Sequence, residues 1–185
     1  MKIPKHAKPV FTGEIFTVYQ WPQKLFDGSS ATFEMVWRIG CTDVIATLDN
    51  KIIILKQKQP GRDWYFSLPW GRLEKGETQL KWAKRELLEE TWCSSKNWQK
   101  FQSWNSAPKV DFEETLFVAR DCTMTSLPDT DAGEKISMQL VNFTEFLDIA
   151  RGPNFWITPS FKYCIYECLL DKKLRSEFKK FIFWK

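Results

Sequence analysis

The sequence predicts a single α+β domain over residues 1–185, a sandwich in which a mixed β-sheet lies between helices, with an antiparallel extension at the N-terminus. Three observations lead to this prediction. Runs rich in β-branched and aromatic residues fill most of the first 60 positions and recur after residue 98. A helix-forming run without Pro or Gly lies between them at 78–90. A second helical pattern, at 160–183, ends the chain.

The strands are predicted from apolar runs that are bounded by turn residues. Residues 1–9 precede them as a loose tail, and Pro22 is expected to end the first strand. Asp49 and Asn50 form the polar turn of a hairpin whose two apolar strands indicate burial in the sheet. The predicted strands are 11–21, 31–38 (the second strand of the N-terminal extension), 44–48, 51–57, 98–103, 114–120 and 137–142.

Three helices are predicted, at 78–90, 144–150 and 160–183. Thr78 and Thr144 are the candidate N-caps of the first two, because a threonine hydroxyl accepts a backbone N–H of the first turn. Gly152 and Pro153 are expected to stop the second helix. The residues available to pack the first helix against the sheet are Leu80, Ala83, Leu87 and Leu88.

The composition is that of a globular protein with 43% hydrophobic residues and a net charge of +4. This small excess suits a phosphate-bearing substrate and does not point to nucleic acid. We expect no membrane segment, because no apolar run reaches spanning length, and we expect a cytoplasmic protein with reduced thiols, because its five cysteines form no CxxC pair and no secretion signal precedes them. His6 is the only histidine, which excludes a Ser-His-Asp mechanism and disfavours zinc.

The chemical signal lies in WGRLEKGETQLKWAKRELLEETWC, residues 70–93. Glu86, Glu89 and Glu90 stand at i, i+3 and i+4, which places their carboxylates on one helical face. Three like charges repel one another, and a hard divalent cation such as Mg²⁺ or Mn²⁺ removes that cost. The alternative is an ordinary solvent-exposed helix. The glycines that precede the helix, Gly71 and Gly76, favour a catalytic loop instead.

The spacing resembles the Nudix box of the Nudix hydrolases, which is glycine, five residues, glutamate, seven residues, then Arg-Glu-apolar-x-Glu-Glu-x-glycine. Residues 71–93 match it, except that Trp92 stands in place of the final glycine. The resemblance implies the Nudix-type α/β/α sandwich. It also implies metal-dependent hydrolysis of the pyrophosphate bond in a nucleoside diphosphate derivative, with Mg²⁺ or Mn²⁺ as the cofactor.

The same resemblance implies a role for each residue of the site. Arg85 would orient a glutamate, and Glu77 would support the geometry of the loop and helix. Glu134, or Asp131 in second place, would supply a metal ligand or base from the polar loop at 121–135. The implied metal ligands are Glu86, Glu90, Glu89 and the backbone carbonyl of Trp70, and the implied catalytic residues are Glu89, Arg85, Glu77 and Glu134.

The flanking segments resemble the ADP-ribose pyrophosphatase branch of the family. That branch implies a homodimer formed through the N-terminal strands, residues 1–38, whose partner closes the substrate site; an extra hairpin on a monomer is the alternative. Many members carry Gln-x-Arg before the box, whereas Gln57-Lys58-Gln59 lacks that arginine, and Arg62 is the candidate replacement. The expected substrate-binding residues are Arg62, Gln57, Gln59 and Arg72.

Three functions therefore remain open at this point. The first is hydrolysis of ADP-ribose or a nucleotide sugar. The second is a catalytically impaired domain that only binds a nucleotide, which Trp70 and Trp92 in place of small residues leave open. The third is a house-cleaning nucleoside triphosphate pyrophosphatase, against which the N-terminal extension argues.

Tryptophan is unusually frequent, with 10 residues against 8 glycines. Trp92 and Trp70 stand where the family has glycine or alanine, and Trp37, Trp64 and Trp82 occupy positions that also suit a small residue. Two origins stay open: a gene in which UGA means glycine, translated as tryptophan, or a diverged family member. In either case an indole at position 92 is expected to strain the helix end, where a left-handed cap favours glycine.

Overall fold

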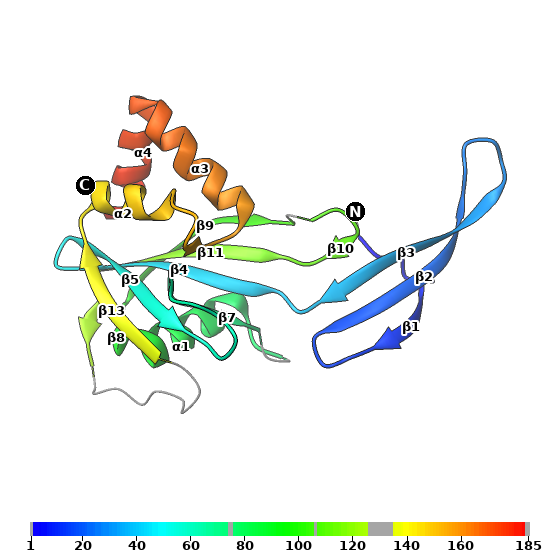
Figure 1. Cartoon of the computed structure of the whole chain (residues 1–185), viewed down its shortest axis with the longest axis horizontal. Helices are drawn as coiled ribbons and strands as arrows, with labels where there is room; N and C mark the ends of the chain where they lie inside the picture. Colours follow the sequence, from blue (N-terminus) through cyan, green and yellow to red (C-terminus); the bar gives the residue numbers. More distant parts are fainter. Residues whose placement is uncertain (1, 74–75, 106, 126–134, 184–185) are drawn as a thin grey trace.

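The computed structural model describes residues 2–73, 76–105, 107–125 and 135–183. It consists of a body, in which sheet and helices are layered, and an arm of strands that extends from it (Figure 1). The helices are α1 (Gln79–Thr91), α2 (Phe143–Ala150), α3 (Pro159–Leu170) and α4 (Lys172–Phe183). The strands are β1 (Lys8–Thr12), β2 (Phe16–Lys24), β3 (Ser30–Arg38), β4 (Cys41–Leu48), β5 (Lys51–Lys58), β6 (Tyr65–Ser67), β7 (Trp70–Arg72), β8 (Cys93–Ser94), β9 (Asn97–Trp104), β10 (Val110–Asp111), β11 (Glu114–Arg120), β12 (Thr123–Met124), β13 (Lys135–Val141) and β14 (Phe155–Trp156).

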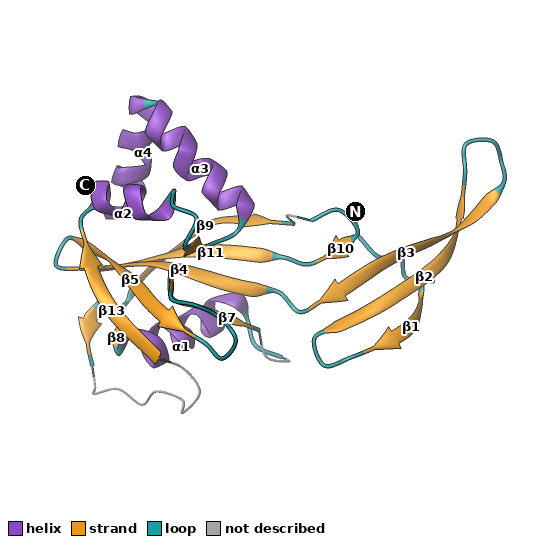
Figure 2. Cartoon of the chain, in the orientation of Figure 1, coloured by secondary structure: helices purple, strands orange, loops and turns teal. Residues whose placement is uncertain are grey.

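The body confirms the predicted α/β/α sandwich with a mixed sheet. Its strands run in the order β14-β6-β5-β4-β11-β9, with β13 beside β5 and β7 beside β4. β11 is parallel to β4 and antiparallel to β9. Helix α1 covers one face of the sheet, and α2, α3 and α4 cover the other (Figure 2). Each face has its own apolar cluster, centred on Leu87 under α1 and on Phe146 and Phe161 under the other helices.

The arm confirms the predicted antiparallel extension in β1, β2 and β3, and its fourth strand, β10, pairs with β3 in parallel. The single strand predicted at 11–21 is wrong, because the chain turns at Gly13, whose N–H donates to the carbonyl of Phe16 at 2.9 Å. Pro22 does not end β2 either. Strand β1 pairs with β2 only as far as Gln20, so Pro22 lies where one edge of β2 is open, a position that tolerates proline.

The arm meets the body at Gly40, between β3 and β4. A β-carbon on Gly40 would come within 2.6 Å of the carbonyl oxygen of Glu113. The same carbonyl accepts the N–H of Cys41 at 3.1 Å, and the carbonyl of Gly40 accepts the N–H of Leu73 at 3.1 Å. Three segments therefore meet at this junction, and glycine permits their close approach.

Two helix predictions need correction. The helix expected at 160–183 is two helices, because Asp171 is extended and its carboxylate accepts the N–H groups of Lys173 and Leu174 at 2.6 and 3.1 Å, capping α4. Asn142, rather than Thr144, caps α2, in a capping box with Glu145. Within the described residues, no helix has the length and apolar character needed to cross a membrane.

Candidate active site

The loop predicted to precede the first helix is held to that helix at Gly71. β7 pairs with β4, placing Gly71 opposite Thr42 and against the helix face that carries Glu86. A β-carbon on Gly71 would overlap the Glu86 carboxyl group. The first glycine of the motif is therefore required by close approach rather than by a special backbone angle.

Two of the predicted carboxylates converge on β7. The backbone N–H of Trp70 donates to Glu90 Oε2 at 2.9 Å, while Glu86 lies against the next residue, Gly71. The Glu89 side chain pairs with Arg85 instead and is 51% exposed. The helix face thus divides into an inner pair of glutamates and an outer one that solvent reaches.

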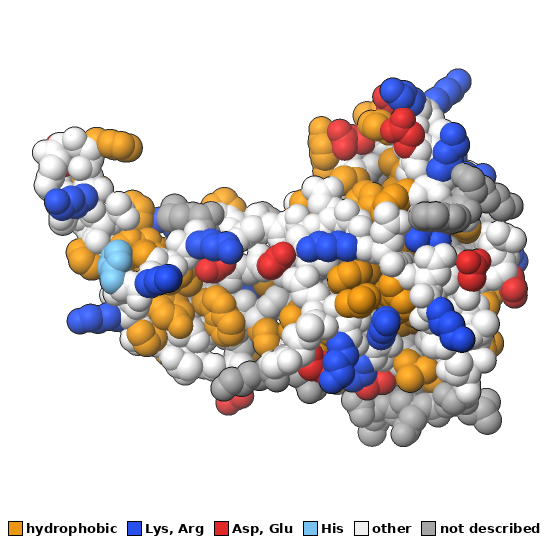
Figure 3. Space-filling model, turned by 180° about the vertical axis from the view of Figure 1, so that it is seen from behind, with side chains coloured by type: hydrophobic (Ala, Val, Ile, Leu, Met, Phe, Trp, Pro, Cys, Tyr) orange, Lys and Arg blue, Asp and Glu red, His pale blue; other side chains and the backbone are white. Residues whose placement is uncertain are grey.

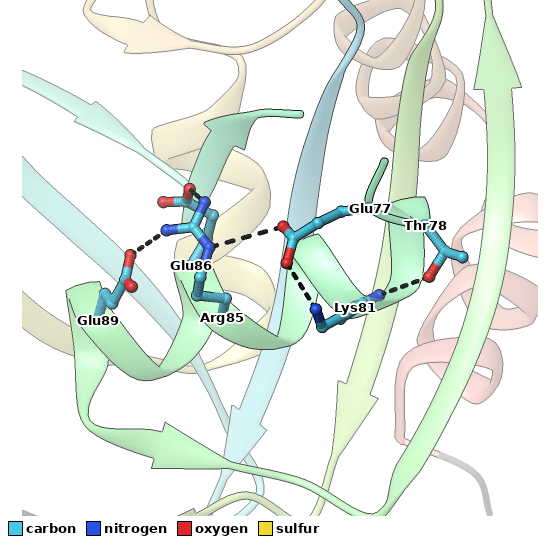
Figure 4. Close-up of polar contacts among 6 residues, drawn as sticks. All are labelled: Glu77, Thr78, Lys81, Arg85, Glu86 and Glu89. Carbon is cyan, nitrogen blue, oxygen red and sulfur yellow. Dashed lines mark hydrogen bonds and ion pairs between the residues drawn. The ribbon is translucent and has the colours of Figure 1, made fainter. Parts of the chain in front are cut away.

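Arg85 links these glutamates to the loop (Figure 4). Its guanidinium donates to Glu86 Oε1 at 2.8 Å and to Glu89 Oε2 at 2.5 Å, and its Nε lies 3.9 Å from Glu77 Oε2. Glu77 in turn pairs with Lys81 at 3.0 Å. The guanidinium also lies 4.2 Å from the centre of the buried Trp82 ring, which supports it from below. The role of Arg85 in orienting a glutamate stays a prediction, and its contacts with Glu86 and Glu89 are the ones that this role requires.

The helix itself begins as predicted, since the hydroxyl of Thr78 accepts the N–H of Lys81 at 3.3 Å. Its buried face differs from the prediction. Trp82, Ala83, Leu87 and Thr91 are buried, whereas Leu80 and Leu88 are exposed.

The donor set suits a hard divalent cation, because every candidate ligand is a carboxylate or carbonyl oxygen. In the part of the chain that the structure describes, no group of three Asp, Glu, His or Cys side chains already forms a metal site. The inner pair, Glu86 and Glu90, is gathered at Trp70 and Gly71, and Arg85 offsets the charge of Glu86 and Glu89. Glu134 and Asp131 lie outside the described residues.

The four predicted substrate-binding residues fall in different surroundings. Gln57 is fully buried and bonds to the Ser67 hydroxyl at 2.6 Å and the Tyr65 hydroxyl at 3.2 Å, so its amide holds β5 to β6. The carbonyl of Gln59 accepts the N–H of Arg62 at 3.1 Å. Arg62 and Arg72 are both exposed, Arg72 at the end of β7.

One residue beside the site was not predicted. Trp156, in β14, packs its ring against Trp70 at 5.6 Å and Tyr65 at 5.4 Å between ring centres. The guanidinium of Arg62 lies 3.3 Å from the centre of the same ring. β14 has only two residues and follows the break at Gly152, so no periodicity in the sequence marks it.

A buried carboxyl lies on the strand next to β7. Asp43 is opposite Trp70 in the pairing of β4 with β7, and only 8% of it is exposed. Burial, with a smaller effect of the nearby Glu114 carboxylate, raises the pKa of Asp43 to about 8.

The end of α1 has the strain predicted for Trp92. This residue is left-handed, with φ 56° and ψ 19°, and its N–H caps the helix by donating to the carbonyl of Leu88 at 2.8 Å. Its indole Nε1 and that of Trp82 are buried, and neither has a hydrogen-bond partner among the described residues. Trp70, in contrast, has no positive φ.

The chain is similar to known proteins in both sequence and fold. The family model of the NUDIX domain matches residues 39–159. The chain is 34% identical over 172 residues to the ADP-ribose pyrophosphatase of Bacillus subtilis (strain 168), covering 91% of this chain and 92% of that protein. It is also 34% identical over 96 residues to the methanol dehydrogenase activator of Bacillus methanolicus, covering 50% and 52% of the two chains. The crystal structure of an ADP compounds hydrolase superposes with a TM-score of 0.71 at 18% identity, covering 89% of this chain and 92% of that one, which shows a shared fold.

Proposed function

This chain belongs to the NUDIX domain family and is a Nudix hydrolase, and we propose that it hydrolyses the pyrophosphate bond of a nucleoside diphosphate derivative, with ADP-ribose as the first candidate. The observation that carries the proposal is the gathering of Glu86 and Glu90 at Trp70 and Gly71, with Arg85 bonded to Glu86 and Glu89. The extent of the match to an ADP-ribose pyrophosphatase, 91% of this chain, supports the choice of substrate.

We assign Glu86, Glu90 and the carbonyl of Trp70 to binding of Mg²⁺ or Mn²⁺. When bound, such a cation neutralises phosphate charge and lowers the pKa of a coordinated water. The Trp70 N–H binds Oε2 of Glu90 and so holds this carboxylate beside the Trp70 carbonyl and Gly71. Arg85 holds Glu86 and Glu89 in place. The exposed Glu89 carboxylate is the one that an attacking water and the substrate can reach.

A substrate panel tests the proposal. The protein is incubated with Mg²⁺ or Mn²⁺ and with ADP-ribose, nucleotide sugars, dinucleotides and nucleoside triphosphates in turn, and the phosphate-containing products are identified. We expect turnover of ADP-ribose or a nucleotide sugar, and its loss in EDTA. Preference for nucleoside triphosphates would replace the proposal with the house-cleaning function, and no turnover of any member would refute hydrolysis of this class.

Replacing Glu90 with Gln tests the site. The amide keeps the size of the side chain and its contact with Trp70 but removes the negative charge that a cation needs. We expect kcat to fall by at least about 10²-fold, as for other charge-stabilising groups, with little change in thermal stability. Glu177→Gln, at an exposed carboxylate of α4, is the matched control and should keep full activity. Retained activity in Glu90→Gln would remove Glu90 from the site.

We further propose that the arm forms a homodimer. Its strands leave large apolar side chains exposed, including Val10 (53%), Phe11 (60%), Phe16 (44%) and Trp37 (42%). Figure 3 shows hydrophobic side chains across one face of this part of the molecule. Exposed apolar patches of this kind on a soluble protein mark interaction sites, and a second copy of the chain is the partner that the ADP-ribose pyrophosphatase branch implies.

A further inference from the structure

Trp156 connects the candidate catalytic glutamates to an exposed arginine. Its ring contacts Trp70, whose backbone N–H binds Glu90, and the same ring carries the guanidinium of Arg62 at 3.3 Å. The three residues come from β7, from β14 and from the loop between β5 and β6. They therefore form a row that leads from the glutamates towards solvent.

The guanidinium of Arg62 keeps its hydrogen-bonding capacity in this arrangement. Within the described residues, the interactions of its side chain are with the rings of Trp156 and, at 5.2 Å, Tyr65, and no carboxylate or carbonyl accepts from it. Stacking on an aromatic ring uses the face of the guanidinium and leaves its N–H edges available. An arginine held in this way is arranged to donate two hydrogen bonds to one phosphate group.

The contacts of Trp156 argue against a role as a platform for the nucleoside base. Arg62 covers its ring face, and the rings of Tyr65 and Trp70 pack against it as well. Although 44% of the residue is exposed, a base could stack on it only by displacing the arginine. The face of the Trp156 ring is therefore already occupied by the Arg62 guanidinium.

We propose that Trp156 is a positioning residue that holds the Arg62 guanidinium in place to bind a phosphate of the nucleoside diphosphate substrate. The inference rests on the proposed function, since it concerns the substrate of the same site. It adds a specific claim: substrate affinity depends on Trp156, which contacts the substrate only through Arg62.

Four variants test this claim: Arg62→Met, Trp156→Leu, the double variant, and Trp156→Phe, which keeps an aromatic ring. KM and kcat are measured with the best substrate of the panel, and the Kd for ADP is measured by calorimetry. Loss of a hydrogen-bonded charge pair predicts a rise of about tenfold in KM and Kd for Arg62→Met and for Trp156→Leu, with kcat within about twofold of the wild type. The double variant should be no worse than Arg62→Met, and Trp156→Phe should recover most of the affinity.

Lys84→Met is the matched control, because Lys84 is an exposed cation that lies 6.0 Å from the ring of Trp98, in β9. It should leave KM unchanged. Additive effects of the two single variants, or Trp156→Phe as weak as Trp156→Leu, would overturn the inference. So would a folded Trp156→Leu variant with normal KM and Kd. Failure of the proposed function is distinct, because the wild type would then turn over no substrate, while the Kd values would still report the coupling between the two residues.

Discussion

At the scale of single residues, the tryptophans that replace small residues are not equivalent. Trp92 needs the left-handed conformation, which costs roughly 1–2 kcal/mol for a residue with a β-carbon. Trp70 needs no such conformation and packs against Trp156. Trp82 is 3% exposed and supports Arg85, although its indole N–H lacks a partner among the described residues. Strain therefore singles out position 92.

We expect Trp92→Gly to be more stable than Trp92→Ala by about 1 kcal/mol, because both remove the indole and only glycine is unstrained at φ 56°. Against the wild type, Trp92→Gly should gain stability, since it also removes a buried indole N–H without a partner. Urea denaturation measures both differences. Equal stability of the glycine and alanine variants would show that the cap is not strained.

The origin of these tryptophans has a separate test. If the gene uses UGA for glycine, the coding DNA carries UGA at positions 70 and 92, and the natural protein has glycine at both. UGG codons at these positions would identify genuine tryptophans and a diverged family member. The strain at Trp92 is the structural reason to sequence this stretch first.

Some residues of the site could be predicted from the sequence and others could not. Fixed spacing along one loop and one helix joins Glu86, Glu90 and Gly71, so the sequence pattern alone predicts that they lie close together. Trp156 reaches Arg62 across more than 90 residues of chain, through a strand of two residues. Only tertiary structure brings such a pair together.

At the scale of elements, the long strands and the box helix were predictable because their apolar patterns repeat over several residues. The short strands β6, β7, β8, β10, β12 and β14 were not, since two or three residues contain no period. The break between α3 and α4 was missed because Asp171 acts through its side chain and carries no Pro or Gly signal.

The buried Asp43 in β4 predicts a pH-dependent stability. Its carboxyl has a pKa of about 3.9 in the unfolded chain, and burial raises this pKa to about 8 in the folded protein. Between these values the folded state holds the extra proton, so the free energy of unfolding falls as pH rises, by at most about 1.4 kcal/mol per pH unit. Above about pH 8 this contribution no longer changes.

Asp43→Asn should remove this dependence, because the amide stays neutral. Urea denaturation of EDTA-treated protein between pH 5 and 8 should show the variant gaining on the wild type as pH rises. Asp148→Asn, at a carboxylate that is 57% exposed, is the control and should follow the wild type. A difference between Asp43→Asn and the wild type that stays constant with pH would contradict the raised pKa.

At the scale of the whole molecule, the arm and the body differ in how they bury apolar surface. The body buries its sheet under helices on both faces, whereas the arm exposes apolar side chains on its own strands. The predicted sandwich and extension are both confirmed by the structure. The proposed dimer, in which the arm takes part, is tested in solution.

We expect the protein to have twice the chain mass in sedimentation and light-scattering measurements. Phe11→Asp, which places a charge on β1, should shift it towards the monomer and reduce turnover, because the partner would no longer close the site. Leu170→Asp, at an 88% exposed residue of α3, should leave the dimer intact. A wild type that is monomeric at every concentration would refute the dimer.

The junction at Gly40 also bears on how this protein can evolve. The matched family domain begins at residue 39, immediately before the junction, yet it includes β10, which pairs with β3 of the arm. A recombination event that exchanged residues 1–38 alone would pair β10 with a β3 strand from another protein. The new arm would also have to fit the crowded Gly40 and Glu113. Inheritance of the arm should therefore follow that of the body, and gene trees built from the two parts should agree.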